Sequence, residues 1–288
     1  MSIAALFDTP QALPTIPKVA QELIQSFSRE DVAIDEIARH LSADPVLSAK
    51  TLRLANSAYF HVSRQVASVD DAIRMLGFVM IRNLVIGCGV TGAFKSVPGL
   101  DLPQFWRHSL HTAGASRWLA QTLDRNSDLA FTVGLVHGVG QLVMHAAAPA
   151  AMKPLDAECH PLAFERTALE QARLGYHHGE VGAELAARWK FPAEVSDALR
   201  AAADPLRAGA SSEIGSLVHI AAWRSRVALF DLDAAQAAAG CPGALGRAIG
   251  LPVTWLAAEG TLGFEASSGL PAMPPLAELT SGLEAMLD

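Results

Sequence analysis

Apolar residues recur every three or four positions along most of the 288-residue chain, a spacing typical of amphipathic helices. A helix expected near residue 20, for example, carries Val19, Leu23 and Phe27 on one face. The chain shows no sustained alternation of apolar and polar residues. It also has no Asn-Gly or Asp-Gly turn of the kind that β-hairpins favour. The sequence therefore predicts an all-α fold of about a dozen helices.

Local signals mark where several of these helices begin and end. Asp44 followed by Pro45 is typical of a helix start, because the carboxylate caps free N–H groups and proline suits the first turn. Ser68 with Asp71 three residues later resembles a capping box. Gly77 is expected to end that helix before a long apolar one. Further helices are expected over 103–124, 128–147, 161–174, 177–190, 192–202 and 211–229.

Charge and hydropathy exclude some classes of protein. The net charge is −7 and the basic residues are dispersed, whereas nucleic-acid binders usually carry a basic stripe or patch. No uninterrupted apolar run reaches the roughly 18 residues that indicate a membrane span. The most apolar window, 78–94, is broken by Arg82 and Asn83. We therefore expect neither nucleic-acid binding nor a membrane span.

The cysteines and the N-terminus indicate a cytoplasmic protein. Cys88, Cys159 and Cys241 are odd in number and far apart, so neither a disulfide framework nor a CxxC zinc motif is expected. The first residues lack a basic segment and include Asp8, which is unlike a secretory signal. We expect reduced thiols in the cytoplasm.

Histidines are the most informative candidate site residues. His108 and His111 lie three apart in an expected helix, and His137 interrupts a strongly apolar segment. His177 and His178 open another expected helix. Such histidines could converge on a metal ion, because imidazole is a common ligand. Each could equally be a hydrogen-bonded histidine of the core.

Seven motifs occur in an order that resembles the HDOD domain of bacterial signalling proteins, over about residues 13 to 202. They are LPTIP (13–17), DPVL (44–47), LRLANSAYF (52–60), SVDDAIRMLG (68–77), FWRHS (105–109), GLVHGVGQLV (134–143) and HHGEVGAELAARWKFP (177–192). HDOD domains are similar to the HD and HD-GYP phosphohydrolases, which are metal-binding helical bundles. The resemblance implies a bundle of this type with an N-terminal subdomain (1–100), a degenerate HD-like subdomain (101–210) and a C-terminal helical extension (211–288).

The sequence departs from the catalytic pattern at its most important position. The resemblance places a metal-binding His-Asp doublet at 137–138, but this chain has His137 and Gly138. Gln141 stands where HD-GYP proteins usually have lysine. His108, His137 and His178 remain as vestigial ligand positions. Two-metal phosphoryl chemistry needs bridging oxygen ligands. We therefore expect no bound metal, no other cofactor and no enzymatic activity.

Two further motifs have alternative interpretations. GCGVTG (87–92) formally matches GxGxxG, but it lies in an expected helix after no strand, so close helix packing or a kink is favoured over dinucleotide binding. In LRLANSAYF, Arg53, Asn56 and Tyr59 could share a ligand or partner surface. Alternatively, Asn56 simply ends the helix while Arg53 caps nearby carbonyl groups.

These observations lead to three functional hypotheses. The first is a non-catalytic signal-transduction output module that binds a signalling protein partner, or a ligand in the degenerate cleft. The second is a metal-dependent phosphohydrolase with altered ligands. The third is a sensor of a small, nucleotide-like ligand that performs no turnover. We favour the first, and expect Arg53, Asn56, Tyr59, His108, His137 and His178 to be the candidate binding residues.

Overall fold

Every regular element in the described part of the chain is a helix, so the predicted all-α fold is confirmed. The computed structural model describes residues 2–9, 16–25, 34–60, 65–207, 212–251 and 271–287. These residues divide into two compact units. One unit comprises 14–96 with 186–192 and 280–288, and the other comprises 1–13, 97–185 and 193–279. The three-part division expected from the sequence stays a prediction.

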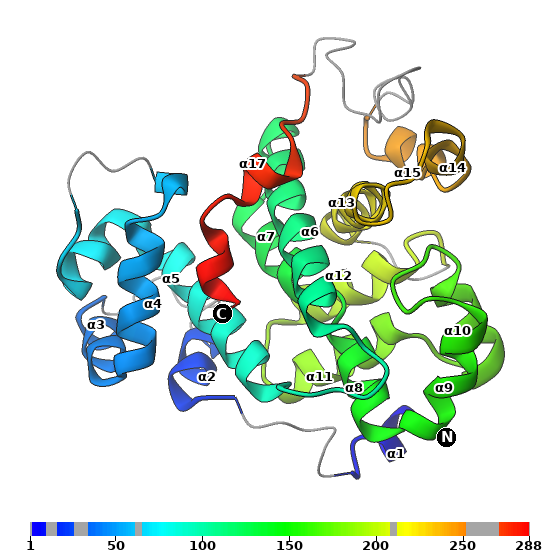
Figure 1. Cartoon of the computed structure of the whole chain (residues 1–288), viewed down its shortest axis with the longest axis horizontal. Coiled ribbons are helices and arrows are strands. Elements are labelled where there is room, and N and C mark those ends of the chain that lie inside the picture. The colour runs from blue at the N-terminus through cyan, green and yellow to red at the C-terminus, as the bar shows by residue number, and fades with distance from the viewer. Residues whose placement is uncertain are drawn as a thin grey trace. The chain divides into compact units, whose positions relative to one another are not determined.

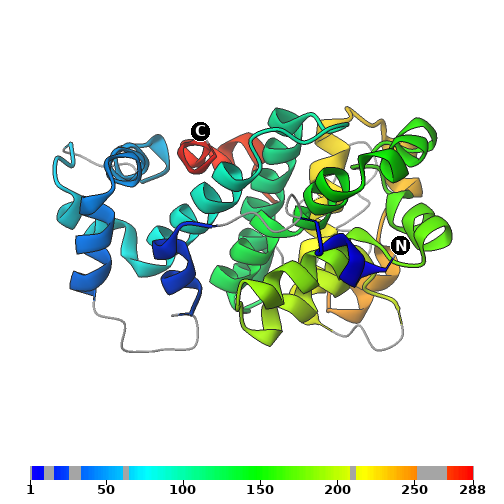
Figure 2. The same cartoon turned by 90° about the horizontal axis from the view of Figure 1, so that it is seen from below.

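The unit containing residues 14–96 is organised around one long apolar helix, α5, against which α2, α3 and α4 pack (Figure 1). Its elements are α2 (Lys18–Gln25), α3 (Ile34–Ala43), α4 (Pro45–Ala55), the 3-10 helix η3 (Ala58–Phe60), α5 (Val69–Ala93) and the C-terminal 3-10 helix η4 (Leu283–Met286). Figure 2 shows the same helices from below. This arrangement buries the apolar face of each short helix against α5.

Both predicted helix starts in this unit are confirmed. The Asp44 carboxylate accepts the N–H groups of Val46 and Leu47, and Pro45 occupies the first turn of α4. The Ser68 hydroxyl accepts the N–H of Asp71 at the start of α5. Each contact satisfies a donor that the helix itself leaves free.

The predicted break at Gly77 is present as a kink inside α5. Gly77 has φ +76°, a left-handed conformation that glycine adopts without steric cost. Farther along α5, a Cβ on Gly89 would lie 3.3 Å from the Cβ of Ala20 in α2. Gly89 therefore permits close packing of α2 against α5, as expected, whereas a Cβ on Gly92 would meet nothing within 4 Å.

The second unit is built around α6, which packs against α7 and α13, while α12 packs against α13 (Figure 1). Its helices are α1 (Ile3–Leu6), α6 (Leu102–Thr122), α7 (Ser127–Val136), α8 (Val139–Ala147), α9 (Pro149–Glu158), α10 (Arg166–Leu174), α11 (His178–Arg188), α12 (Ala193–Ala203), α13 (Glu213–Leu229), α14 (Ala234–Ala239), α15 (Gly243–Ala248) and α17 (Leu276–Thr280). The end of α11 and the last residue of α17 belong to the other unit. All the helices that carry the candidate histidines lie here.

The expectation of one continuous helix over 128–147 is wrong. The helix α7 ends at Val136 and α8 begins at Val139. The cause is local, because the His137 ring donates from Nδ1 to the carbonyl oxygen of Gly134 at 2.7 Å. The ring thereby takes an acceptor that a continuous helix would offer to the N–H of Gly138.

Two helical stretches are long and apolar enough to cross a membrane by length and composition alone, namely Val69–Ala93 and Ser127–Ala147. Within the chain, however, 67% of the first apolar window and 94% of the second are buried. Such burial is typical of core helices, which pass the same test. The absence of a membrane span stays a prediction.

A close crossing of α8 and α11 provides a test of the fold. A Cβ on Gly140 would collide with the carbonyl oxygen of His178, whereas a Cβ on Gly182 would meet its nearest atom at 3.4 Å, an ordinary contact. We expect Gly140→Ala to lower the free energy of unfolding by about 1–3 kcal/mol through overpacking. Urea denaturation measures this change.

The matched control is Gly182→Ala, placed on the opposite helix of the same crossing. We expect it to leave stability unchanged or raise it by up to about 1 kcal/mol, because alanine favours the helix. Equal effects of the two substitutions would contradict the proposed crossing.

Candidate functional site

His108 and His137 meet inside the second unit. The middle of α6 supplies His108, and the break after α7 supplies His137. Their Nε2 atoms lie 3.3 Å apart, and the two rings are in edge-to-face contact with centroids separated by 5.1 Å. His108 and His137 are 1% and 6% exposed, so this contact is shielded from water. The sequence expectation that histidines from separate helices converge is met for this pair.

Neighbouring groups orient the two rings. The His137 Nδ1 donates to the Gly134 carbonyl at 2.7 Å, which leaves Nε2 of a neutral His137 as an acceptor. His108 then donates from Nε2, and its Nδ1 accepts from the Ser225 hydroxyl of α13 at 2.8 Å. When both rings are neutral, all three hydrogen bonds can form. Ser225 donates to His108, His108 donates to His137, and His137 donates to Gly134.

Burial keeps both rings uncharged. It holds the pKa of His108 well below its ordinary value, with smaller effects from His137 and Arg226. Burial likewise lowers the pKa of His137 to about 3, against the opposing hydrogen bond to Gly134. Arg226 keeps its positive charge at neutral pH, although burial lowers its pKa to about 10. The pair is thus a neutral hydrogen-bonded element at physiological pH.

A second polar cluster surrounds Glu170 of α10, whose side chain is wholly buried. Its Oε2 accepts two hydrogen bonds from His178, one from the backbone N–H and one from Nδ1, each at 2.8 Å. Its Oε1 accepts from Nε2 of Gln141 and, at 2.9 Å, from Nε of Arg166. Four donors on three helices therefore saturate one carboxylate.

The charge state of Glu170 follows from these partners. Burial alone raises the pKa of the carboxyl, but the nearby charge of His178, its hydrogen bonds and that of Arg166 outweigh this and lower the pKa to about 2. Glu170 is therefore ionised at neutral pH. Its backbone contact also places a negative charge at the start of α11, where the helix dipole favours one.

Arg166 extends the cluster to a second carboxylate. Its Nη2 forms an ion pair with Asp156 at 2.8 Å, and its Nη1 donates to the carbonyl of Cys159 at 2.7 Å. Asp156 also lies 3.2 Å from Nε2 of His145, whose Nδ1 donates to the carbonyl of Gln141 at 2.7 Å. Both carboxylates of the cluster are thus committed to internal partners.

The space beside Gly138, where an HD phosphohydrolase has its aspartate, is filled by another side chain. A Cβ on Gly138 would lie 2.9 Å from Cζ and 3.0 Å from Cε2 of Phe105. Phe105 is 2% exposed and belongs to the α6 segment that also carries His108. The site therefore lacks the carboxylate, and a side chain at position 138 would require the Phe105 ring to shift.

The residues present do not fit a metal ion. No group of three or more histidine, cysteine, aspartate or glutamate side chains suited to hold a metal occurs within the described ranges of the chain. His178 is near enough for its charge to influence the pKa values of His108 and His137, but its own Nδ1 is bound to Glu170. The three vestigial positions thus serve two separate hydrogen-bond networks.

The other predicted site residues lie in the first unit. Asn56 caps the end of α4 through Nδ2, which donates to the carbonyl groups of Leu52 and Val66, each at 2.8 Å. The N–H of Val66 donates back to Asn56 Oδ1 at 2.8 Å. These contacts support the helix-end interpretation. Arg53 is exposed on the last turn of α4, and the Tyr59 ring contacts Phe60.

Sequence reasoning missed most of the second cluster. The missed residues of that cluster are Glu170, Arg166, Asp156 and His145, and Ser225 beside the histidine pair was missed as well. Only one local signal was available, the spacing of Arg166 and Glu170 by four positions in a helix, which favours an ion pair. That spacing is also common on solvated helix faces, so it did not indicate burial.

Comparison with known families decides the classification. The model of the HDOD domain matches residues 13–205 of this chain. The chain belongs to the HDOD family. The match covers the region that contains both the Asn56 helix end and the histidine and Glu170 clusters.

Solved structures with the same fold include other HDOD-like proteins. One from Shewanella amazonensis, provisionally named a phosphohydrolase, is 29% identical with a TM-score of 0.72, over 99% of this chain and 97% of that one. An HDOD domain protein of unknown function from Geobacter sulfurreducens is 25% identical with a TM-score of 0.63, over 78% and 76%. One from Marinobacter aquaeolei, provisionally named a signal transduction protein, is 24% identical with a TM-score of 0.65, over 84% and 54%.

A curated relative is longer than this HDOD protein. An uncharacterized protein of Treponema pallidum is 25% identical over 199 residues, which is 68% of this chain and 39% of that protein. This chain therefore spans about two fifths of the length of that relative.

The buried histidines predict loss of stability in acid. His137 has a pKa of about 3 in the folded chain against an ordinary value of 6.5, so unfolding takes up a proton between these values. The stability that the neutral ring confers is complete above pH 6.5 and is lost progressively as the pH falls towards 3. Glu170 adds a loss below pH 4.5, because its folded pKa is about 2.

Chemical denaturation at pH values from 7 to 4.5 measures this slope. In a His137→Gln variant we expect the slope to fall by up to about 1.4 kcal/mol per pH unit, the effect of one proton. A slope that is the same in the variant and the parent protein would contradict the assignment of a low pKa to His137.

The contact between Phe105 and Gly138 predicts coupling between these positions. Aspartate is a favoured residue at a helix start. Gly138→Asp should nevertheless lower stability by about 1–3 kcal/mol, because its side chain meets Phe105. Phe105→Ala alone should cost about 3–5 kcal/mol through a cavity. The double variant should lose at least about 0.5 kcal/mol less than the sum, as measured by urea denaturation. Additive losses would show that Phe105 does not fill this space.

Proposed function

We propose that this HDOD protein is a non-catalytic signal-transduction module that acts by binding a protein partner. The observation that carries the proposal is the Phe105 ring, which fills the place beside Gly138 where a phosphohydrolase needs a carboxylate. Replacing a metal-binding aspartate by glycine removes one side chain that could coordinate a metal ion. The Phe105 ring lies so close to Gly138 that a side chain restored there would have to displace it.

The remaining acidic groups support the same proposal. A two-metal phosphohydrolase needs oxygen ligands that bridge or flank the ions. Glu170 and Asp156 are the carboxylates of the polar cluster, and both pair with the buried Arg166. Releasing either one to a metal ion would remove one of the two counter-charges of the buried guanidinium, which is unfavourable. The cluster therefore serves to hold helices together.

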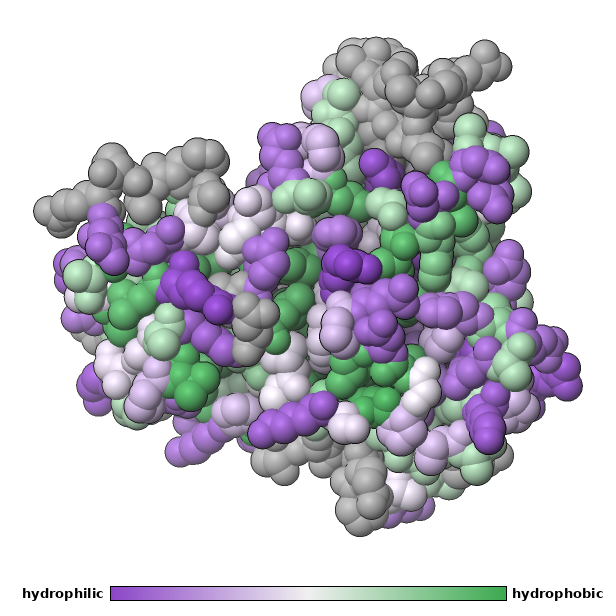
Figure 3. Space-filling model, in the orientation of Figure 1, coloured by the Kyte–Doolittle hydropathy of each residue, from purple (hydrophilic) through white to green (hydrophobic). Residues whose placement is uncertain are grey.

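The surface is compatible with reversible protein contacts. On the face drawn in Figure 3, hydrophilic and hydrophobic residues are interspersed instead of forming one large apolar area. Among the described residues, the large hydrophobic side chains with high exposure are Val46 and Leu206, at 62% and 70%. Transient partners usually meet surfaces of this mixed composition, whereas obligate interfaces are more apolar.

We further propose a cytoplasmic location. Cys88, Cys159 and Cys241 are free thiols, and each is partly buried. Free thiols and the absence of disulfides among these residues are typical of proteins that function in a reducing compartment.

A hydrolysis assay tests the proposal at the histidine pair. The purified chain is supplied with Mg²⁺, Mn²⁺ or Zn²⁺ and with bis(p-nitrophenyl) phosphate, nucleoside monophosphates or cyclic dinucleotides. We expect its turnover to equal that of a folded His108→Gln/His137→Gln variant, because neither ring can activate a metal-bound water. Metal-dependent turnover that disappears in the variant would establish the phosphohydrolase hypothesis instead.

Complementation in the host bacterium tests the positive half of the proposal. A strain that lacks the gene is complemented with the parent chain or with the same double variant, and the transcriptome is compared. A binding module should restore the expression pattern with either chain, provided that circular dichroism and cellular abundance show equal folding. Restoration by the parent alone would contradict a non-catalytic role.

A further inference from the structure

A hollow of about 570 Å³ lies between α3 and α5 in the first unit, away from the histidine cluster along the chain. Its volume is within the range of 300–1,000 Å³ that is usual for ligand sites. The described residues that line it are Ala38, Arg39, Ser42 and Ala43 of α3 and Asp70, Ile73 and Arg74 of α5. None of these residues belongs to the site described above.

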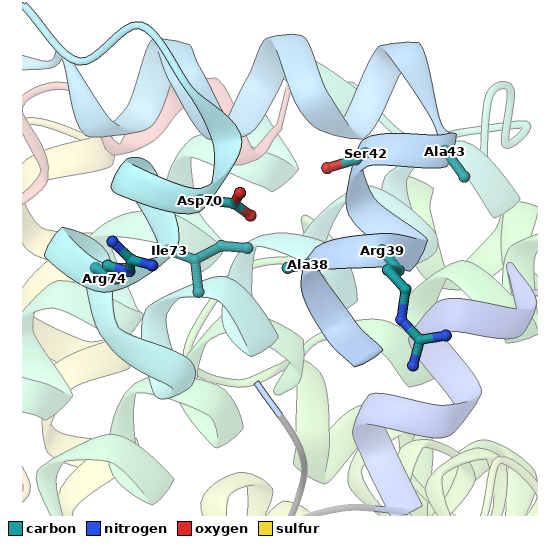
Figure 4. Close-up of a pocket in the computed structure, with 7 residues that line it drawn as sticks. All are labelled: Ala38, Arg39, Ser42, Ala43, Asp70, Ile73 and Arg74. Atoms are coloured by element: carbon teal, nitrogen blue, oxygen red, sulfur yellow. The ribbon is translucent and has the colours of Figure 1, made fainter. Parts of the chain in front are cut away.

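The side chains in the hollow are arranged with polar groups above an apolar floor (Figure 4). The Asp70 carboxylate and the Ser42 hydroxyl are turned towards the same space from opposite helices. Ala38 and Ile73 lie below them, and Ile73 is 4% exposed. The Arg39 side chain extends away from this space.

The Asp70 carboxylate, which lines this hollow, has unused hydrogen-bonding capacity. Asp70 lies in the first turn of α5, but within the part of the chain that the structure describes its carboxylate has no hydrogen bond or ion pair. The adjacent Asp71 differs, because its carboxylate accepts from the Ser68 hydroxyl at 2.7 Å. Of the two carboxylates in the first turn of α5, that of Asp71 is hydrogen-bonded, whereas that of Asp70, among the described residues, is not. Only Asp70 faces the hollow.

We propose that this hollow accepts a lysine or arginine side chain from the protein partner, with Asp70 and Ser42 binding its cationic head. This inference rests on the proposed function, since it assumes that the module acts through a partner. An aliphatic stem over Ala38 and Ile73 with a charged head at the polar edge suits a long basic side chain, which buries its methylene groups while its charge stays hydrated.

Charge supports a basic occupant over an acidic one. The carboxylate points into the hollow, whereas Arg39 is directed away from it and Arg74 lies at its edge beside Ile73 (Figure 4). Asp70 and both arginines are exposed, so water and salt screen all three charges, and the carboxylate that points into the hollow is the one nearest an occupant. The chain as a whole carries a net charge of −7, which favours encounters with basic partners.

Side-chain analogues test this inference without a known partner. The isotope-labelled full chain is titrated with Nα-acetyl-lysine amide or Nα-acetyl-arginine amide, and backbone amide shifts are recorded. Nα-acetyl-norleucine amide supplies a similar stem without the charge, and Nα-acetyl-glutamate amide supplies the opposite charge. We expect saturable shifts at residues 38–43 and 70–74 with the two cationic probes, at affinities on the order of millimolar, typical of such small ligands.

Matched substitutions in one helix turn assign the binding to Asp70. Asp70→Asn should weaken the cationic probes by up to about fivefold, the upper end of the range for one exposed charge pair. Asp71→Asn removes the same charge from the same turn of α5 and should leave their affinity unchanged. Equal weakening by both substitutions would show a general effect of charge and would overturn the proposal.

The remaining outcomes are also decisive. No saturable shift with the cationic probes, an equal response to norleucine, or preferential binding of the glutamate analogue would each overturn the proposal. Metal-dependent hydrolysis by a chain that binds the cationic probes would refute the proposed function alone. A chain without turnover that fails to bind these probes would refute only this inference.

Discussion

The buried carboxylate of Glu170 is the interaction on which the second unit most depends. A carboxylate in a protein interior is unfavourable by several kcal/mol unless charges and hydrogen bonds compensate for the lost water. Here α8 supplies Gln141, α10 supplies Arg166, and the first residue of α11 supplies two donors from His178. The compensation therefore requires three helices to lie in one arrangement. Any packing that displaced one of them would leave a buried charge with too few partners.

This dependence shows how the second unit holds polar groups in its interior through its own side chains. In a metalloenzyme, ions hold the ends of several helices together through shared ligands. In this chain, the guanidinium of Arg166 lies between two carboxylates and supplies a fixed positive charge in the interior. The His108 and His137 pair, by contrast, is uncharged and joins α6, α13 and the end of α7 through hydrogen bonds alone. Both clusters are thus held by hydrogen bonds or ion pairs among the chain's own groups.

The structural features that the sequence predicted correctly depend on contacts between residues that are close together along the chain. The helix starts at Asp44 and Ser68 need only a side chain and the next three residues, so their residue types sufficed. The family motifs also located His108 and His137, which prove to be in contact. The break after Val136 was not predicted, because apolar periodicity does not report a ring that bonds to its own helix.

The contacts missed from the sequence join segments that are distant along the chain. Glu170 and Gln141 are 29 residues apart, and Ser225 and His108 are 117 apart, so no local pattern relates them. Arg166 and Glu170 could form an ion pair either on the surface or in the interior. Which of these occurs depends on the segments that pack over α10. The role of Phe105 was likewise hidden, because its motif was read only for the histidine that it carries.

The packing of Phe105 against Gly138 has an evolutionary consequence. The two residues are compatible as a pair, since the ring occupies the volume that a side chain at position 138 would need. A mutation that restored an acidic residue at 138 would meet the ring, and a mutation that shrank the ring would first open a hole in the core. Each single step towards a metal centre therefore passes through a less stable protein. A lineage with this pair would therefore gain an acidic residue at position 138 only in a particular order of mutations, even if the histidines stayed in place.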